Sequence, residues 1–237
     1  MWRVGQLRLR QVVLSTVHKR LNRRQFQAVA SLGVLSWAAG AAGLLQLSTA
    51  RAAKPEEGFD YQVLATPAPR LVQQGVEVIE FFRYGCPFCN RLEPLLQAWK
   101  PRLPAHVQFH YVPVSFHSTA HQQLYLTLKH LGQDARLHTQ VYDTIHRQGK
   151  SLEMLMEISE WAASHGIAVP VFEAAWHSPQ VAQAMQQSNA LVQAYGVTGV
   201  PVFGVGGRYV TSPAMVGGNN ARALQVVDDL VGRYKSA

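Results

Sequence analysis

A run of seven residues, V-E-V-I-E-F-F at 76–82, constrains the fold more than any other stretch of the chain. Apolar residues occupy neighbouring positions near its end, which is typical of a strand buried on both faces in the middle of a sheet. A turn follows at 84–89, and Pro87 then begins an apolar helix, because proline fits the first helical turn. Pro94 lies inside this helix and should kink it. A central strand that passes directly into a helix predicts an α/β fold.

Further strands are expected on either side of a long helical segment. The second strand of the chain is expected at 107–112. Two short strands flank Gly206 and Gly207, a dipeptide suited to a tight hairpin. An amphipathic helix follows at 219–234, with an asparagine at its start as the N-cap.

The segment 118–195 carries no strand pattern and is expected to form consecutive helices. Glycines lie where helix C-termini are expected and divide this segment: Gly132, Gly149, Gly166 and Gly196. Asp134 and Ser151 are expected to cap two of the helices. The resulting order, β-α-β, helices, β-β-α, predicts an α/β sheet domain with an inserted α-helical domain.

The net charge of +8 comes from the N-terminal segment. Residues 1–52 hold eight Lys or Arg residues and no Asp or Glu, whereas residues 53–237 hold 14 basic and 14 acidic residues. A nucleic-acid-binding domain needs basic residues clustered in its folded part. Because the sequence shows no such cluster beyond residue 52, it argues against nucleic acid as a partner.

The same N-terminal segment has the layout of an export signal. Its basic part is followed by the uncharged residues 28–47 and by a small-residue site that ends at Ala52. Arg23 and Arg24, with Phe26 close behind, resemble a twin-arginine signal. We expect cleavage after Ala52, and a retained membrane anchor is the alternative, since 28–47 is long enough to span a bilayer. Both place the remaining chain outside the cytoplasm, in the periplasm, where disulfides persist.

Cys86 and Cys89 are the only cysteines in the chain. A zinc site needs about four ligands. His117 and His121 could complete such a site, but 27 residues separate the two halves. A structural disulfide between cysteines so close in sequence would close a very short loop and stabilise little. The sequence therefore favours a redox role over a metal site or a covalent staple.

The position of the pair explains how it could transfer electrons. Cys86 directly precedes the helix, where free backbone N–H groups and the helix dipole stabilise a thiolate. Cys89 lies one turn later and can resolve a mixed disulfide formed on Cys86. A second feature is Pro201 in V-T-G-V-P-V-F, a candidate for a cis bond, although most X-Pro bonds are trans.

Three stretches resemble the DsbA family of thiol:disulfide interchange proteins, within the thioredoxin-like folds. They are V-I-E-F-F-x-Y-G-C-P-F-C at 78–89, F-E-A-A-W at 172–176 and T-G-V-P-V-F-G-V-G-G-R-Y at 198–209. The resemblance implies an α/β, thioredoxin-like fold with an inserted α-helical domain. Residues 53–116 and 196–237 would form the thioredoxin-like domain, and residues 117–195 the insertion.

The resemblance also implies the members of an active site. The two cysteines would be the redox pair, with no metal and no cofactor beyond their disulfide. A cis Val200–Pro201 bond would pack beside them. Pro87 and Phe88 would help to form a hydrophobic groove that binds unfolded chains.

Glu80 matches the buried acidic residue of the family, which could relay the proton of Cys89. Its place between two apolar residues favours burial over exposure. The family often pairs this acid with a lysine on the next strand. The corresponding stretch, 110–116, contains no lysine, and His110 could take its place.

Together these features predict an exported oxidase that donates its disulfide to reduced or unfolded exported proteins. The resemblance implies a monomer that is reoxidised by a quinone-linked membrane oxidase of the DsbB type. Many relatives carry histidine where this chain has Phe88. Imidazole can donate charge or a hydrogen bond to the thiolate, whereas the phenyl ring can only pack, so we expect this protein to be a weaker oxidant than its histidine-bearing relatives. The alternatives are a disulfide reductase or isomerase, and a chaperone or metal carrier that uses the same groove. Residues 53–75 are too short to form the dimerisation domain found in exported isomerases of this group.

Overall fold

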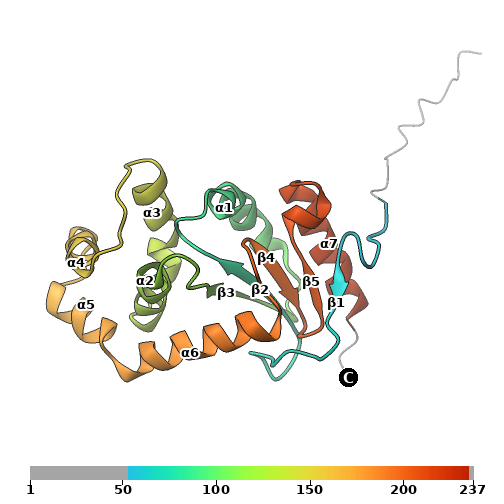
Figure 1. Ribbon diagram of the computed structural model, residues 1–237, viewed down its shortest axis with the longest axis horizontal. Helices are drawn as coiled ribbons and strands as arrows, with labels where there is room; N and C mark the ends of the chain where they lie inside the picture. The colour runs from blue at the N-terminus through green and yellow to red at the C-terminus, as the bar shows by residue number, and fades with distance from the viewer. Residues whose placement is uncertain (1–52, 235–237) are drawn as a thin grey trace, which may run out of the picture. The chain divides into compact units, whose positions relative to one another are not determined.

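The computed structural model describes residues 53–234, which belong to one compact unit (Figure 1). The predicted export signal, its cleavage site and the alternative membrane anchor all lie outside the described residues. Within residues 53–234, none of the helices combines the length and apolar character needed to cross a membrane.

A five-stranded sheet forms the centre of the fold, in the order β1-β5-β4-β2-β3. The strands are β1 (Gln62–Val63), β2 (Val76–Phe82), β3 (Val107–Pro113), β4 (Val202–Val205) and β5 (Tyr209–Thr211). β2 runs parallel to β3 and antiparallel to β4, and all seven of its residues are buried. The prediction of a central strand is therefore confirmed, because both neighbours and both faces of β2 are covered.

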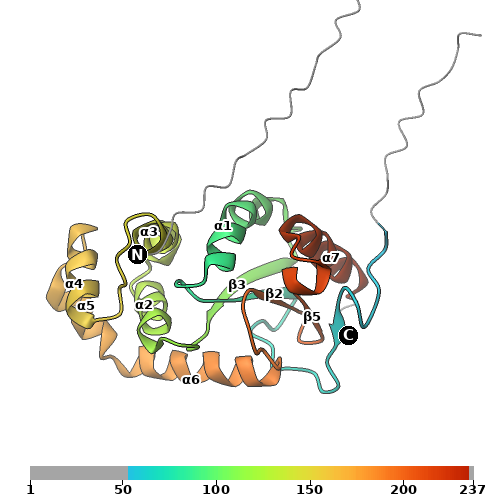
Figure 2. The same cartoon turned by 45° about the horizontal axis from the view of Figure 1, so that its top comes forward.

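Helices cover both faces of the sheet (Figures 1 and 2). On one face lie α1 (Pro87–Trp99) and α7 (Asn220–Arg233), whose apolar side chains share a core with β2 and β4. The C-terminal part of α6 (Pro179–Ala194) lies on the other face. There the ring centroids of Phe81 and Tyr195 are 5.2 Å apart.

The remaining helices lie between β3 and β4 in the chain. They are α2 (Thr119–His130), α3 (Asp134–His146), α4 (Leu155–Ser164) and α5 (Val169–Trp176), followed by α6. Phe82, the last residue of β2, joins their core to the sheet, because its ring centroid lies 5.1 Å from that of Tyr125 in α2. The thioredoxin-like fold with an inserted helical domain is confirmed, while the exact limits 117 and 195 stay predictions.

Local signals in the sequence differ in how well they match the structure. Gly206 and Gly207 form the β4–β5 turn with φ of 60° and 70°, values that suit glycine. Asn219 caps α7 by accepting a hydrogen bond from a backbone N–H. The cap prediction for Ser151 is wrong, because α4 begins at Leu155. Asp134 is the first residue of α3, one position after the residue at the N-cap.

The described part of the chain also contains two short 3-10 helices. They are Lys100–Arg102, directly after α1, and Pro213–Val216, before α7. The first continues α1 past Trp99. This continuation carries the side chain of Lys100 toward β3, where its ammonium group meets Tyr111.

Candidate active site

Cys86 and Cys89 lie at the N-terminal end of α1, directly after β2 and a tight turn. The backbone N–H of Cys86 donates to the carbonyl oxygen of Arg83 at 3.0 Å, which closes this turn. Cys86 takes the N-cap position and Pro87 the first helical position. Both cysteines are free thiols in this structure. Cys86 keeps 6% of its surface exposed and Cys89 none, so a substrate can reach only the first sulfur.

The two thiols have opposite electrostatic environments. The hydrogen bond from the Cys89 thiol lowers the pKa of Cys86 from its ordinary value of 9.0 to about 6, against the effect of burial. The backbone N–H groups of Cys89 and Phe88 and the charge of Arg83 act in the same direction. Burial and the shared hydrogen bond raise the pKa of Cys89. At neutral pH the Cys86 sulfur is therefore a thiolate and the Cys89 sulfur a thiol.

The loop before β4 is distant from Cys86 in the sequence but lies next to it in the fold. The Val200–Pro201 peptide bond is cis, as expected, and Pro201 is buried. The Cys86 sulfur lies 3.5 Å from the carbonyl oxygen of Val200, a distance at which the Cys86 thiol, when protonated, donates a hydrogen bond to that oxygen. The fold thus places Val200 and Pro201 beside Cys86.

Pro87 and Phe88 face solvent beside the two cysteines. The Phe88 side chain is 59% exposed, and the guanidinium of Arg91 lies 4.5 Å from its ring centre. An exposed aromatic ring next to a nucleophile offers apolar contact to an incoming chain. The geometry suits the expected binding role of these two residues.

Glu80 is buried in β2 with 1% exposure, as the sequence predicted. Neither of its carboxylate oxygens has a hydrogen-bond partner among the described residues. Burial raises its pKa well above the ordinary value of 4.5, the charge of Glu93 raises it further, and the charge of Lys100 acts in the opposite direction. The charge of Glu80 in turn contributes to the raised pKa of Cys89. Glu80 therefore influences the protonation of Cys89, and the charge of Cys86 in turn raises the pKa of Glu80.

The prediction that His110 on β3 is the basic partner of Glu80 is wrong. His110 lies in register with Ile79, so its side chain points to the other face of the sheet. Tyr111 is the β3 residue in register with Glu80. The basic group near Glu80 comes instead from Lys100, after the end of α1.

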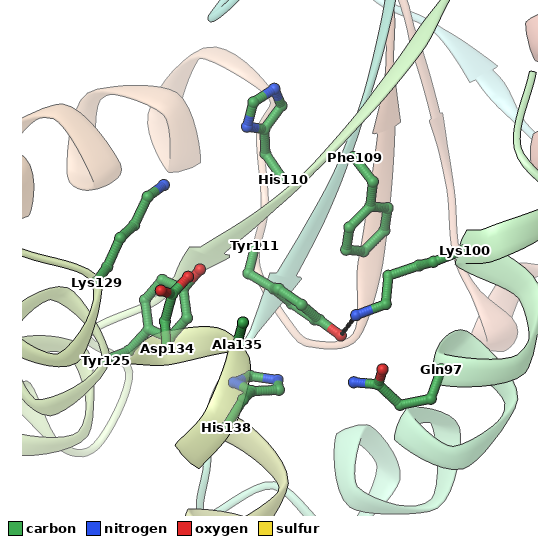
Figure 3. Close-up of a pocket in the computed structure, with 10 residues that line it drawn as sticks. All are labelled: Gln97, Lys100, Phe109, His110, Tyr111, Tyr125, Lys129, Asp134, Ala135 and His138. Carbon is green, nitrogen blue, oxygen red and sulfur yellow. Dashed lines mark hydrogen bonds between the residues drawn. The ribbon is translucent and has the colours of Figure 1, made fainter. Parts of the chain in front are cut away.

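A polar network that the sequence did not predict lies beneath the site. The Lys100 ammonium donates to the Tyr111 hydroxyl at 2.9 Å, as Figure 3 shows, and this hydroxyl donates to Glu93 at 2.9 Å. His138 of α3 lies 3.5 Å from the same carboxylate. Glu93 follows Cys89 by four residues and therefore shares its helix face, which is the signal that could have identified it.

His138 connects this network to the active-site turn. Its Nδ1 lies 3.0 Å from the hydroxyl of Tyr84, two residues before Cys86. Its ring packs against Phe82, Tyr111 and other aromatic rings. The inserted helices thus contact the redox site through a buried histidine. Among residues 53–234, no group of three or more His, Cys, Asp or Glu side chains is placed to hold a metal ion.

Comparisons with known proteins agree with this geometry. A family described as DSBA-like thioredoxin domain matches residues 96–226. The thiol:disulfide interchange protein DsbA of Azotobacter vinelandii is 38% identical over 182 residues, which cover 76% of this chain and 85% of that protein. The DsbA of Pseudomonas syringae pv. tomato is 35% identical over 207 residues, which cover 86% of this chain and 96% of that protein.

Solved structures give the same result. The crystal structure of Pseudomonas aeruginosa DsbA superposes with a TM-score of 0.72 at 32% identity, over 76% of this chain and 94% of that one. The oxidoreductase DsbA from Xylella fastidiosa superposes with a TM-score of 0.71 at 29% identity, over 76% of this chain and 97% of that one. The chain therefore belongs to the DsbA family of thiol:disulfide interchange proteins.

Proposed function

We propose that Cys86 and Cys89 are the redox pair of this thiol:disulfide oxidoreductase, and that it works as an oxidase of reduced exported proteins. The observation that carries this proposal is the difference between the two thiols. A Cys86 pKa of about 6 stabilises the reduced protein at neutral pH. A dithiol whose reduced form is stabilised gives a more oxidising disulfide. The disulfide therefore passes readily to a client.

The reaction begins when a client thiolate attacks the Cys86 sulfur of the Cys86–Cys89 disulfide. A client–Cys86 bond forms and the bond between the two cysteines breaks. The electron pair goes to the Cys89 sulfur, which then binds a proton. A second client thiolate attacks the client sulfur of this mixed disulfide, and Cys86 leaves as a thiolate. Two electrons pass from the client to the protein, and the client gains a disulfide.

Glu80 is proposed to supply the proton that the Cys89 sulfur takes up. Cys89 has no exposed surface, so bulk water does not reach its sulfur directly. Burial raises the pKa of Glu80 and so widens the pH range over which this carboxyl holds a proton, which is the state of a proton donor. The Tyr111, Glu93 and Lys100 network lies close enough to act on its charge.

Client binding is assigned to the surface around Cys86. Phe88 and Pro87 provide an exposed apolar contact on one side. Val200 and Pro201 lie on the other, and the backbone before β4 is close enough to align an extended client segment. Apolar contact with little sequence preference suits a protein that oxidises many unfolded chains.

The cellular setting follows from the sequence. Residues 1–52 are proposed to direct export to the periplasm through a signal of the twin-arginine type. A monomer is proposed, with no cofactor other than the disulfide. A quinone-linked membrane oxidase of the DsbB type is proposed to remove the two electrons and restore the disulfide.

The test is the equilibrium constant of the protein with glutathione, followed by oxidation of a reduced peptide. We expect a potential more positive than the value of about −270 mV typical of thioredoxin. We also expect peptide oxidation that Cys86→Ser abolishes. A potential at or below the thioredoxin value would favour a reductase. Full activity of Cys86→Ser in preventing aggregation, without oxidation by the wild type, would favour a chaperone.

A further inference from the structure

The two residues between the cysteines bring no polar side-chain atom to Cys86. Pro87 has none, and the Phe88 ring lies exposed against the guanidinium of Arg91. The thiolate at Cys86 is therefore stabilised from elsewhere. Cys89 and the backbone supply hydrogen bonds, and Arg83 is the cationic side chain that acts on Cys86.

Arg83 lies at the start of the active-site turn, directly after β2. Its backbone carbonyl accepts the hydrogen bond from the Cys86 N–H, so the residue is fixed relative to the nucleophile. Its side chain is half-buried and folds back over Gly85. A Cβ atom at Gly85 would lie 2.7 Å from the Nη1 atom of Arg83, closer than real Cβ contacts. The absence of a side chain at Gly85 thus makes room for the guanidinium over the residue that directly precedes Cys86.

The charge of Arg83 is not neutralised by a carboxylate of residues 53–234. The arginine ion pairs among the described residues involve Arg147, Arg222 and Arg233 instead. Glu153 lies 3.5 Å from the Nε2 atom of His121. A half-buried cation without a carboxylate partner is available to the Cys86 thiolate, and partial burial limits its screening by salt.

His121 of α2 borders the same space. Its Cε1 and Nδ1 atoms would lie 3.2 and 3.3 Å from a Cβ at Gly85, and Nδ1 has no hydrogen-bond partner among the described residues. Burial lowers its pKa, and the charges of Arg83 and His146 act in the same direction, against Ser151 and Glu153. This histidine is therefore uncharged at neutral pH, and the lasting positive charge beside Gly85 belongs to Arg83.

We propose that Arg83 is an electrostatic positioning residue of the redox site, which provides the cation beside the Cys86 sulfur that the side chains between the cysteines do not provide. Reduction of the disulfide places a negative charge on Cys86, and Arg83 stabilises that charge. Arg83 thereby shifts the dithiol–disulfide equilibrium toward the reduced protein and strengthens the disulfide as an oxidant. The inference rests on the proposed redox role of Cys86 and deepens it.

The test measures the Cys86 thiolate by its ultraviolet absorbance during a pH titration of the reduced protein. Removing one partly solvated charge in Arg83→Gln should raise the pKa of Cys86 by about half a unit. The equilibrium constant with glutathione should then become about threefold less oxidising. Arg83→Lys should keep most of the wild-type value. Arg91→Gln is the matched control, because it removes a charge from the same surface that is directed at Phe88, and its titration should follow the wild type.

Gly85→Ala provides a second variant that leaves the charge in place. The added methyl group should displace the end of the Arg83 side chain, which is flexible, and produce a smaller shift in the same direction. An Arg83→Gln protein that titrates like the wild type, or an Arg91→Gln protein that shifts equally, would overturn the proposal. The titration needs no client, so its outcome is separate from that of peptide oxidation, on which the proposed function depends.

Discussion

The sulfur of Cys86 lies 3.5 Å from the carbonyl oxygen of Val200, although 114 residues separate them in the chain. This contact joins the N-terminal end of α1 to the loop before β4. The nucleophile is therefore bordered by backbone polar groups on two sides, the helix N–H groups and a carbonyl oxygen. A client chain that binds along the loop would present its own sulfur to Cys86 rather than to the buried Cys89.

Cys89→Ala should raise the pKa of Cys86 clearly above its wild-type value of about 6. The hydrogen bond from the Cys89 thiol is the largest cause of the low value, and alanine removes its donor. Cys89→Ser keeps an O–H donor and should raise the pKa less. Thiolate absorbance against pH measures both. Equal titration of the alanine and serine variants would show that the hydrogen bond does not hold the value down.

The reduced protein should gain stability relative to the oxidised protein as pH rises from 5 to 8. The pKa of Cys86 is lower in the folded state, about 6, than its ordinary value of 9.0. Its stabilisation is therefore complete above pH 9 and is lost as pH falls through 6. The raised pKa of Cys89 has the opposite sign and removes stability above pH 9.

Urea unfolding of both redox forms at each pH measures this difference. The oxidised form is the internal control, because it has no thiol to titrate and shares all other ionisable groups. The gain in the free energy of unfolding should be well below about 4 kcal/mol, since partial solvation weakens the interaction. Parallel pH profiles for the two forms would contradict the low pKa of Cys86.

Glu80→Gln should stabilise the protein at pH 7 by about 2 kcal/mol, because it replaces a buried carboxyl group without hydrogen-bond partners by a neutral amide. The pKa of Glu80 is raised in the folded state. Its cost therefore begins as pH rises past the ordinary value of 4.5, where the unfolded chain ionises and the folded protein does not, and it is complete above the raised pKa. The same variant should slow reduction of the disulfide about tenfold, through loss of the proton donor to Cys89.

Glu77→Gln is the control for this variant. Glu77 lies on the same strand and is equally buried, but it accepts hydrogen bonds from the Leu71 N–H and the Tyr195 hydroxyl. Its replacement should destabilise the protein and leave the rate of disulfide reduction unchanged. Stopped-flow reduction and urea unfolding at pH 4 and 7 distinguish the two sites. If the Glu80→Gln protein is reduced at the wild-type rate, Glu80 does not donate the proton to Cys89.

The sequence predicted the parts of the site that depend on local signals. The strand at 76–82, the helix start at Pro87 and the glycine hairpin were correct, because a short apolar run, proline geometry and positive φ act over a few residues. The short strand β1 was missed, since its two residues pair only with β5 at the other end of the chain. The helix α5 was not resolved as a separate element for a similar reason, as eight residues carry little periodicity.

The polar network beneath the cysteines depends on contacts between distant elements. His138 lies near Glu93 only because α3 packs beside α1. This contact could not be predicted from the position of His138 in the sequence. Lys100 replaces the expected basic residue of β3 because a 3-10 helix extends α1. The family resemblance predicted the buried acid Glu80, but it did not predict the residues that provide the charges around it.

Phe88→His should make the disulfide more oxidising, with the equilibrium constant for glutathione shifted about threefold to tenfold. Imidazole at the start of α1 can donate a hydrogen bond or charge to the Cys86 thiolate, which the phenyl ring cannot do. The ring is 59% exposed, so its removal leaves no cavity and the variant should fold normally. Phe88→Leu is the control, because it removes the contact with Arg91 without adding a polar atom, and it should keep the wild-type constant. If the histidine variant is no more oxidising than the leucine variant, the residue at position 88 does not set the redox potential. The charge of Arg83 would then be sufficient to stabilise the Cys86 thiolate.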